Sequence, residues 1–161
     1  WLNSTVGIDD EVTKGYAPVI VDKNRITILG RTLTFARDGL PASIISYFNS
    51  SNQSMVEKGE SIVRHPFRFI IEKENGEQIK LVPGELTFTE KTNSRVVWNV
   101  TNTADEFDIV LTGQMEFDGF VDYSLKLTAK SSVKVKDIRL EIPVAEEKAA
   151  EEIEEEFKEK E

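Results

Sequence analysis

The chain has 161 residues, nine Phe, no Cys and a formal net charge of −9, which predicts one domain with its own apolar core and excludes disulfides and thiolate metal sites. The acidic balance argues against a nucleic-acid partner, because such binding neutralises phosphates, and against docking on anionic lipid. No apolar run approaches the roughly 20 residues that span a bilayer, so membrane insertion is not expected.

The first segment, residues 1–16, is polar and has no clear period, so it is interpreted as an arm or linker. The chain starts with Trp1 rather than Met, and no charged region followed by an apolar signal core is present. These features predict a processed or truncated N-terminus.

From residue 17 onward, short apolar segments alternate with turn residues, which is typical of β-strands. Asp38-Gly39, Asn75-Gly76 and Asp118-Gly119 are two-residue hairpin signals, because Gly accepts positive φ. The alternation of apolar and polar residues is clearest on both sides of Asp118-Gly119. Strands are predicted over 19–21, 25–29, 31–36, 42–48, 66–73, 78–82, 85–90, 95–101, 107–117, 121–129 and 133–142.

Two segments depart from this rhythm. Residues 49–65 are polar and predict a long functional or disordered loop with room for a short helix. In the last strand, the apolar residues move from odd positions up to Val135 to even positions from Ile138 onward. A bulge at Lys136-Asp137 would restore the pattern, because it inserts one unpaired residue.

About ten short strands with frequent turns predict an all-β fold, an antiparallel β-sandwich (supersandwich-like) over residues 17–143. Residues 144–161 hold nine Glu and three Lys among strong helix formers, and predict a C-terminal acidic α-helix. An isolated helix of this length is marginal in water, so Ile153 and Phe157 should dock on the sandwich unless the helix frays.

No residue pattern predicts catalysis or a cofactor. His65 is the only histidine and has no nucleophile motif near it. The acids of 105–108 and 116–122 lack the spacing of a calcium loop, and we interpret them as solvated turn acids. They could still include a glycosidase pair, which needs two carboxyls about 5–10 Å apart. Because the solvated-turn interpretation is preferred, we predict no catalytic residue and no metal site.

The candidate carbohydrate-binding residues are Tyr47 and Trp1, because an aromatic ring offers sugars an apolar face and a polar edge. Trp98 and Tyr123 alternate with core positions, so these two are predicted to pack inside the sandwich.

Four segments stand out together: WLNSTVGIDDEV, GRTLTFARDGLPASIISYF, MEFDGFVDYSLKL and VKVKDIRLEIPV. In combination they resemble the large, multi-module glycoside-hydrolase-like proteins of Bacteroides and relatives, which are related to glycoside hydrolase family 123. The resemblance implies an N-terminal β-sandwich module ahead of a catalytic barrel that holds the catalytic carboxylates. It also implies export to the periplasm or cell surface. The acidic tail departs from the family pattern.

The resulting expectation is a non-catalytic module whose partner is the neighbouring catalytic module of a larger carbohydrate-active protein. Such a module should expose an apolar patch where its neighbour docks. Two alternatives remain open. One is a stand-alone carbohydrate-binding module that binds glycan through Tyr47 or Trp1. The other is a complete small hydrolase that uses an acidic pair.

Overall fold

The computed structural model describes residues 10–145, and all regular structure within this range is β-strand. Every strand pairing is antiparallel, so the predicted all-β antiparallel class is confirmed. The predicted C-terminal helix lies outside the described residues. The strands are β1 (Ile20–Asp22), β2 (Arg25–Ile28), β3 (Arg31–Phe35), β4 (Pro41–Phe48), β5 (Met55–Ser61), β6 (Arg68–Lys73), β7 (Val82–Pro83), β8 (Thr87–Lys91), β9 (Arg95–Thr103), β10 (Phe107–Glu116), β11 (Val121–Ala129) and β12 (Val135–Glu141).

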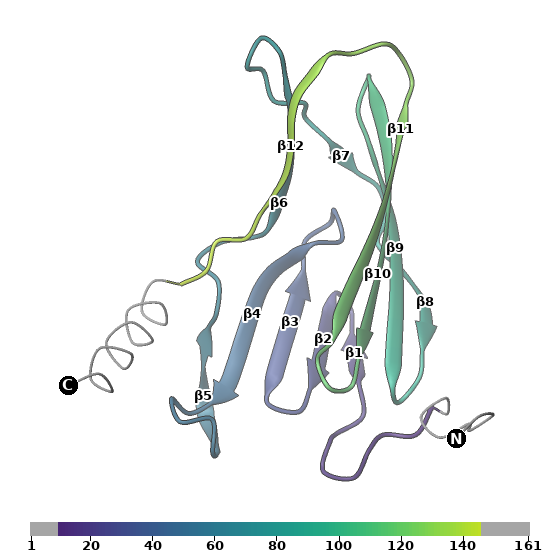
Figure 1. Ribbon diagram of the computed structural model, residues 1–161. Coiled ribbons are helices and arrows are strands. Elements are labelled where there is room, and N and C mark those ends of the chain that lie inside the picture. Colours follow the sequence, from purple (N-terminus) through teal and green to yellow (C-terminus); the bar gives the residue numbers. More distant parts are fainter. Residues whose placement is uncertain (1–9, 146–161) are drawn as a thin grey trace, which may run out of the picture.

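These strands form two facing layers, the arrangement of a sandwich (Figure 1). One layer contains the sheet β1-β2-β3-β4-β5, prolonged by the two-stranded sheet β12-β6. Backbone hydrogen bonds join the two sheets, since Phe67 N donates to Pro41 O and Ile62 N donates to Ile44 O, both at 2.9 Å. The other layer has the order β11-β10-β9-β7, and β8 also pairs with β9.

The main core lies between the layers and is centred on Trp98 of β9, which is fully buried as predicted. Its ring packs on Phe35 at 4.5 Å and meets Tyr123 edge-on at 5.6 Å between centroids. Its Nε1–H donates to Gly39 O at 3.0 Å, so the buried indole nitrogen has a partner. The other buried residues of this cluster are Val19, Ile26, Ile28, Leu33, Leu40, Val96, Val100, Leu111 and Met115.

The three predicted hairpin turns are present. Gly39, Gly76 and Gly119 have φ values of +85°, +83° and +95°, a backbone region that residues with a Cβ rarely adopt. The strand predicted after Gly76 is shorter than expected. Only a bridge from Gln78 to β6 and the two-residue β7 lie in that segment.

The predicted bulge in the last strand is also confirmed. Val135 lies opposite Lys73 and Asp137 lies opposite Glu72, so Lys136 is an extra residue in β12. The insertion puts Val135 and Ile138 on the same face of the strand, which explains the change from odd to even apolar positions.

The loop or short helix predicted for residues 49–65 is wrong, because β5 lies there and pairs with β4 (Ser46 opposite Glu60). β5 is an edge strand and six of its seven residues are exposed. A strand with no buried face has no apolar alternation, so its sequence lacks the period-two pattern.

The arm is described from Asp10 onward. Ser94 Oγ donates to Asp10 Oδ1 at 3.2 Å, and the Tyr16 ring meets Phe117 edge-on at 5.2 Å. The division into an arm (1–16), a sandwich (17–143) and a tail (144–161) stays a prediction.

Candidate functional site

Tyr47, the first predicted sugar-binding residue, is half-buried on β4. It lies beside Gly59 of β5, where an added Cβ would stand 2.8 Å from Tyr47 Cε1. The Cε1 edge of the ring therefore lies against Gly59. The ring–ring contacts within residues 10–145 do not include Tyr47. Trp1, the second candidate, lies outside the described residues, so the structure does not bring the two together.

Three of the acids considered as metal ligands or as a glycosidase pair, Glu106, Asp108 and Asp118, have structural partners. Lys73 Nζ contacts Glu106 at 2.5 Å, and Lys130 Nζ contacts Asp108 at 2.7 Å. The hydrogen bond from Lys73 holds the pKa of Glu106 below its usual value. Asp118 Oδ1 accepts a hydrogen bond from Phe120 N and so stabilises its turn. In residues 10–145, no three His, Asp or Glu side chains gather where a metal ion could bind.

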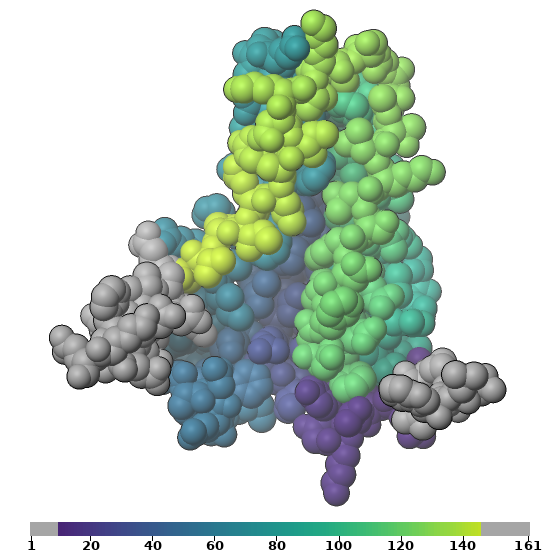
Figure 2. All heavy atoms as spheres, in the orientation of Figure 1, coloured from purple at the N-terminus to yellow at the C-terminus, as the bar shows by residue number. Residues whose placement is uncertain are grey.

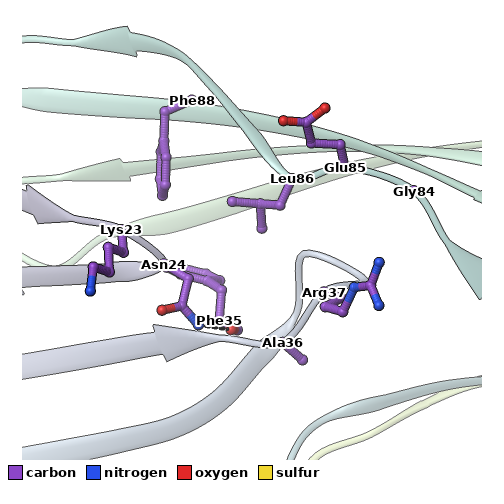
Figure 3. A pocket seen from close by; sticks show the side chains of 9 residues that line it. All are labelled: Lys23, Asn24, Phe35, Ala36, Arg37, Gly84, Glu85, Leu86 and Phe88. Atoms are coloured by element: carbon purple, nitrogen blue, oxygen red, sulfur yellow. Dashed lines mark hydrogen bonds between the residues drawn. The ribbon is translucent and has the colours of Figure 1, made fainter.

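A shallow groove of about 630 Å³ lies between the β2–β3 layer and the segment that leads into β8. Figure 3 shows Leu86 and Phe88 directed toward Asn24 and Phe35 across this groove. Asn24 Nδ2 donates to Phe35 O at 2.6 Å, so its donor is engaged. Further lining residues are Lys23, Ala36, Arg37, Gly84 and Glu85. Only one of these residues is acidic, so the groove contains no carboxylate pair.

A second hollow, of about 240 Å³, lies between the layers, and we call it the interlayer cavity. Asn102 is 4% exposed, and its Nδ2 donates to Asp38 O at 3.1 Å. Its Oδ1 has no protein partner among the described residues. Burial raises the pKa of the Asp38 carboxyl, although its Oδ1 accepts a hydrogen bond from Leu40 N. Apolar side chains thus line the cavity together with the polar groups of Asp38, Arg68, Gln78 and Asn102, and Leu125 of β11 forms part of its wall.

The front border of the sandwich is open between β11 and β12 (Figure 1). Four apolar residues of these strands lie opposite apolar residues that are buried or half-buried, and therefore share the inner face with them. They nevertheless remain partly exposed, because no further strand within residues 10–145 covers them. The four, which we call the open edge, are Leu125 (38% exposed, opposite Leu111), Leu127 (37%, opposite Ile109), Ile138 (48%, opposite Ile71) and Leu140 (43%, opposite Phe69).

The outer face of β12 is charged and internally neutralised. The Arg139 guanidinium contacts carboxylates of Asp137 at 2.6 Å, Glu141 at 3.0 Å and Glu72 at 3.4 Å. Lys136 Nζ contacts Glu72 at 2.7 Å. The usual exposure is therefore reversed on this strand, since its charged residues Asp137, Arg139 and Glu141 are half-buried while the alternating apolar residues are exposed.

The family model described as "Glycoside hydrolase 123, third domain" matches residues 19–151, most of the chain. The chain belongs to this glycoside hydrolase 123 third-domain family. Comparison with curated proteins and with solved structures finds no significant match. Residues 10–145 contain no helix that could cross a membrane.

The third domain of glycoside hydrolase 123 is an accessory domain, so the family match supports an accessory domain of a glycoside-hydrolase-like protein. The resemblance to glycoside hydrolase 123 noted from the sequence is confirmed. The family description numbers this domain third, so its position ahead of a catalytic barrel stays a prediction.

Sequence reasoning did not find the features of the third domain that the structure brings together. The open edge combines strands whose apolar residues look like ordinary core positions. The only available signal was the alternation of Ile138, Leu140 and Ile142 after the bulge, and it does not distinguish a covered face from an uncovered one.

Proposed function

We propose that this chain is a non-catalytic β-sandwich domain that supports or flanks the catalytic domain of a larger glycoside-hydrolase-like protein. The observation that carries the proposal is the open edge, where inward-facing apolar side chains of β11 and β12 stay 37–48% exposed. Exposed apolar surface on an inner face marks a candidate site of protein contact. Family membership supplies the reason to expect a companion domain.

The energetic argument favours a covered edge. Full burial of a Leu or Ile side chain contributes about 1.5–3 kcal/mol, so covering four that are already more than half-buried contributes roughly 1 kcal/mol each. This sum is a large fraction of the free energy of unfolding of a small domain. Docking of a neighbour on this edge would therefore stabilise both domains.

The partner in this proposal is the neighbouring catalytic module of the parent protein, a barrel that holds the catalytic carboxylates. The location, periplasm or cell surface, comes from the family resemblance. Neither the docking of the catalytic module nor the extracytoplasmic location requires a cofactor in this domain.

The test compares the parent polypeptide with a version that lacks residues 17–143. Hydrolysis of a panel of aryl glycosides and the half-life of that activity on heating are measured for both. We expect the shortened enzyme to keep its substrate preference and to lose activity faster on heating. Equal half-lives would contradict the supporting role. Hydrolysis by the 161-residue chain alone would contradict the non-catalytic assignment.

A second candidate function is stand-alone glycan binding, favoured by the groove in Figure 3, whose wall includes Phe88 and Leu86. Lys91 Nζ lies 5.1 Å from the Phe88 ring centroid, however, so a cation already occupies one face of this ring. A glycan array with the wild type and the Tyr47→Ala, Trp1→Ala and Phe88→Ala variants tests this candidate. A hit lost in one variant would support it.

A further inference from the structure

We infer that the open edge receives an extended segment from an adjoining domain of the same polypeptide, which adds as a β-strand against β12 and places apolar side chains over the inner face. This inference rests on the proposed function and specifies how the neighbour docks. Strand addition uses backbone hydrogen bonds for affinity and alternate side chains for specificity, and both are available here.

The first argument is the spacing of the exposed apolar side chains. Ile138, Leu140, Ile142 and Val144 occupy every second position and are 48%, 43%, 51% and 52% exposed. A row with a period of two is complementary to another extended segment, whose side chains also alternate. The bulge at Lys136 is what brings this row onto the inner face, because it reverses the register after Val135.

The second argument is the free backbone along both strands. Among residues 10–145, β12 pairs only with β6 and β11 only with β10, so each has one edge that no other strand of this range pairs with. Edge strands that must stay unpaired are short or bear charges on the exposed side. β5, another edge strand of the same layer, follows this rule with Glu57, Lys58 and Glu60. On β12, the charged residues lie on the outer face and are engaged with one another, so they do not oppose an added strand.

The third argument is the shape of the border. β11 and β12 diverge from their connection at residues 130–134 (Figure 1), and Figure 2 shows the surface hollowed between the yellow-green β12 and the green β11. Leu125 belongs both to the open edge and to the wall of the interlayer cavity. A side chain inserted beside Leu125 would therefore extend the apolar core toward the interlayer cavity.

The occupant is assigned to the same polypeptide because this domain is numbered third in a glycoside hydrolase family. A tethered segment has an effective concentration in the millimolar range, so it outcompetes a second copy of the chain even with modest contact area.

The experiment measures amide hydrogen exchange in the parent polypeptide and in the 161-residue chain. We expect the amides of β12 that do not bond to β6 to exchange about tenfold more slowly, or slower still, in the parent. The Ile138→Asp/Leu140→Asp variant of the parent should lose this protection. Ile20→Asp is the matched control, since Ile20 also lies on an edge strand, β1, and is 60% exposed.

The outcomes separate this inference from the proposed function. Protection of β12 in the parent, lost in the double variant and kept in the control, supports strand addition. Protection of another surface of this domain, with β12 unchanged, overturns the inference and leaves the docking role intact. No protection anywhere in the domain contradicts both. A concentration-dependent dimer of the 161-residue chain with the same β12 protection would assign the edge to a second copy and overturn the inference. If the double variant fails to fold, the wild-type comparison alone decides.

Discussion

Gly113 of β10 lies directly opposite Trp98 of β9, and the indole ring occupies the space where a Cβ on Gly113 would stand. The nearest atoms to that position are Trp98 Cε2 and Cζ2. The same glycine lies opposite Tyr123 of β11, whose ring meets the indole edge-on. The missing side chain thus lets the largest core residue lie across the sheet beneath Tyr123.

Gly113→Ala should destabilise the domain, because the new methyl group forces the buried indole from its position between Phe35 and Tyr123. Overpacking of this kind costs about 1–3 kcal/mol in the free energy of unfolding. Urea denaturation of the wild type and the variant measures it. In a Trp98→Leu background the same substitution should cost clearly less, since the two residues are in contact. An equal cost in both backgrounds would show that the indole is not the obstacle.

Glu72 should make the stability depend on pH in the acid range. Hydrogen bonds from Lys136, and secondarily from Arg139, hold the pKa of Glu72 below the ordinary value of 4.5. A lowered folded-state pKa stabilises the fold above the unfolded value, and this stability is lost as the pH falls from about 4.5 through the lower folded pKa. The melting temperature, measured from pH 7 to pH 2, should fall less steeply in Glu72→Gln. Parallel curves for the two proteins would contradict the linkage.

Asp38 should change the stability with pH in the opposite direction to Glu72. Burial raises the pKa of this carboxyl above 3.8, so the folded state binds the proton more tightly than the unfolded chain does. Its ionised form therefore lowers the stability increasingly as the pH rises from about 3.8 through the folded pKa. Asp38→Asn keeps an acceptor for Leu40 N and removes the charge. The variant should melt higher than the wild type at pH 7 and equally near pH 3. A lower melting temperature at pH 7 would refute this assignment.

Deletion of Lys136 removes the bulge and should reverse the face of every residue on one side of it. Either Val135 turns outward or Ile138 and Leu140 do, so the ladder with β6 and the Arg139 ion pairs cannot both persist. We expect a lower melting temperature and faster amide exchange in β6 and β12. Lys136→Ala is the control, because it keeps the extra residue and removes only the contact with Glu72. Equal losses in the two variants would show that the charge, rather than the bulge, matters.

Ile71 and Ile138 face each other across β6 and β12, yet they differ in exposure, at 1% and 48%. In the 161-residue chain, Ile71→Ala should cost about 2–5 kcal/mol in the free energy of unfolding, the range for a buried aliphatic residue, and Ile138→Ala less than half as much. In the parent polypeptide the cost at Ile138 should rise toward that at Ile71 if a neighbour covers it. Denaturant unfolding of the four variants provides the comparison.

The local alternation and turn residues determined much of the fold before any contact was known. Asp118-Gly119 predicted the hairpin that joins β10 to β11, and the odd-to-even change after Val135 predicted the bulge at Lys136. Both succeed because side-chain direction in a strand and the positive φ of Gly are properties of neighbouring residues. The same reasoning missed β5, whose polar residues carry no period since neither of its faces meets the core.

What only the tertiary structure decided is which apolar rows are covered. Ile71 and Ile138 are the same residue type at equivalent strand positions, but one lies against β10 residues and the other on an open border. Exposure depends on whether another strand lies across the inner face, and that is a relation between segments distant in the sequence. The strands follow from local chemistry, whereas the open edge follows from how the two layers meet.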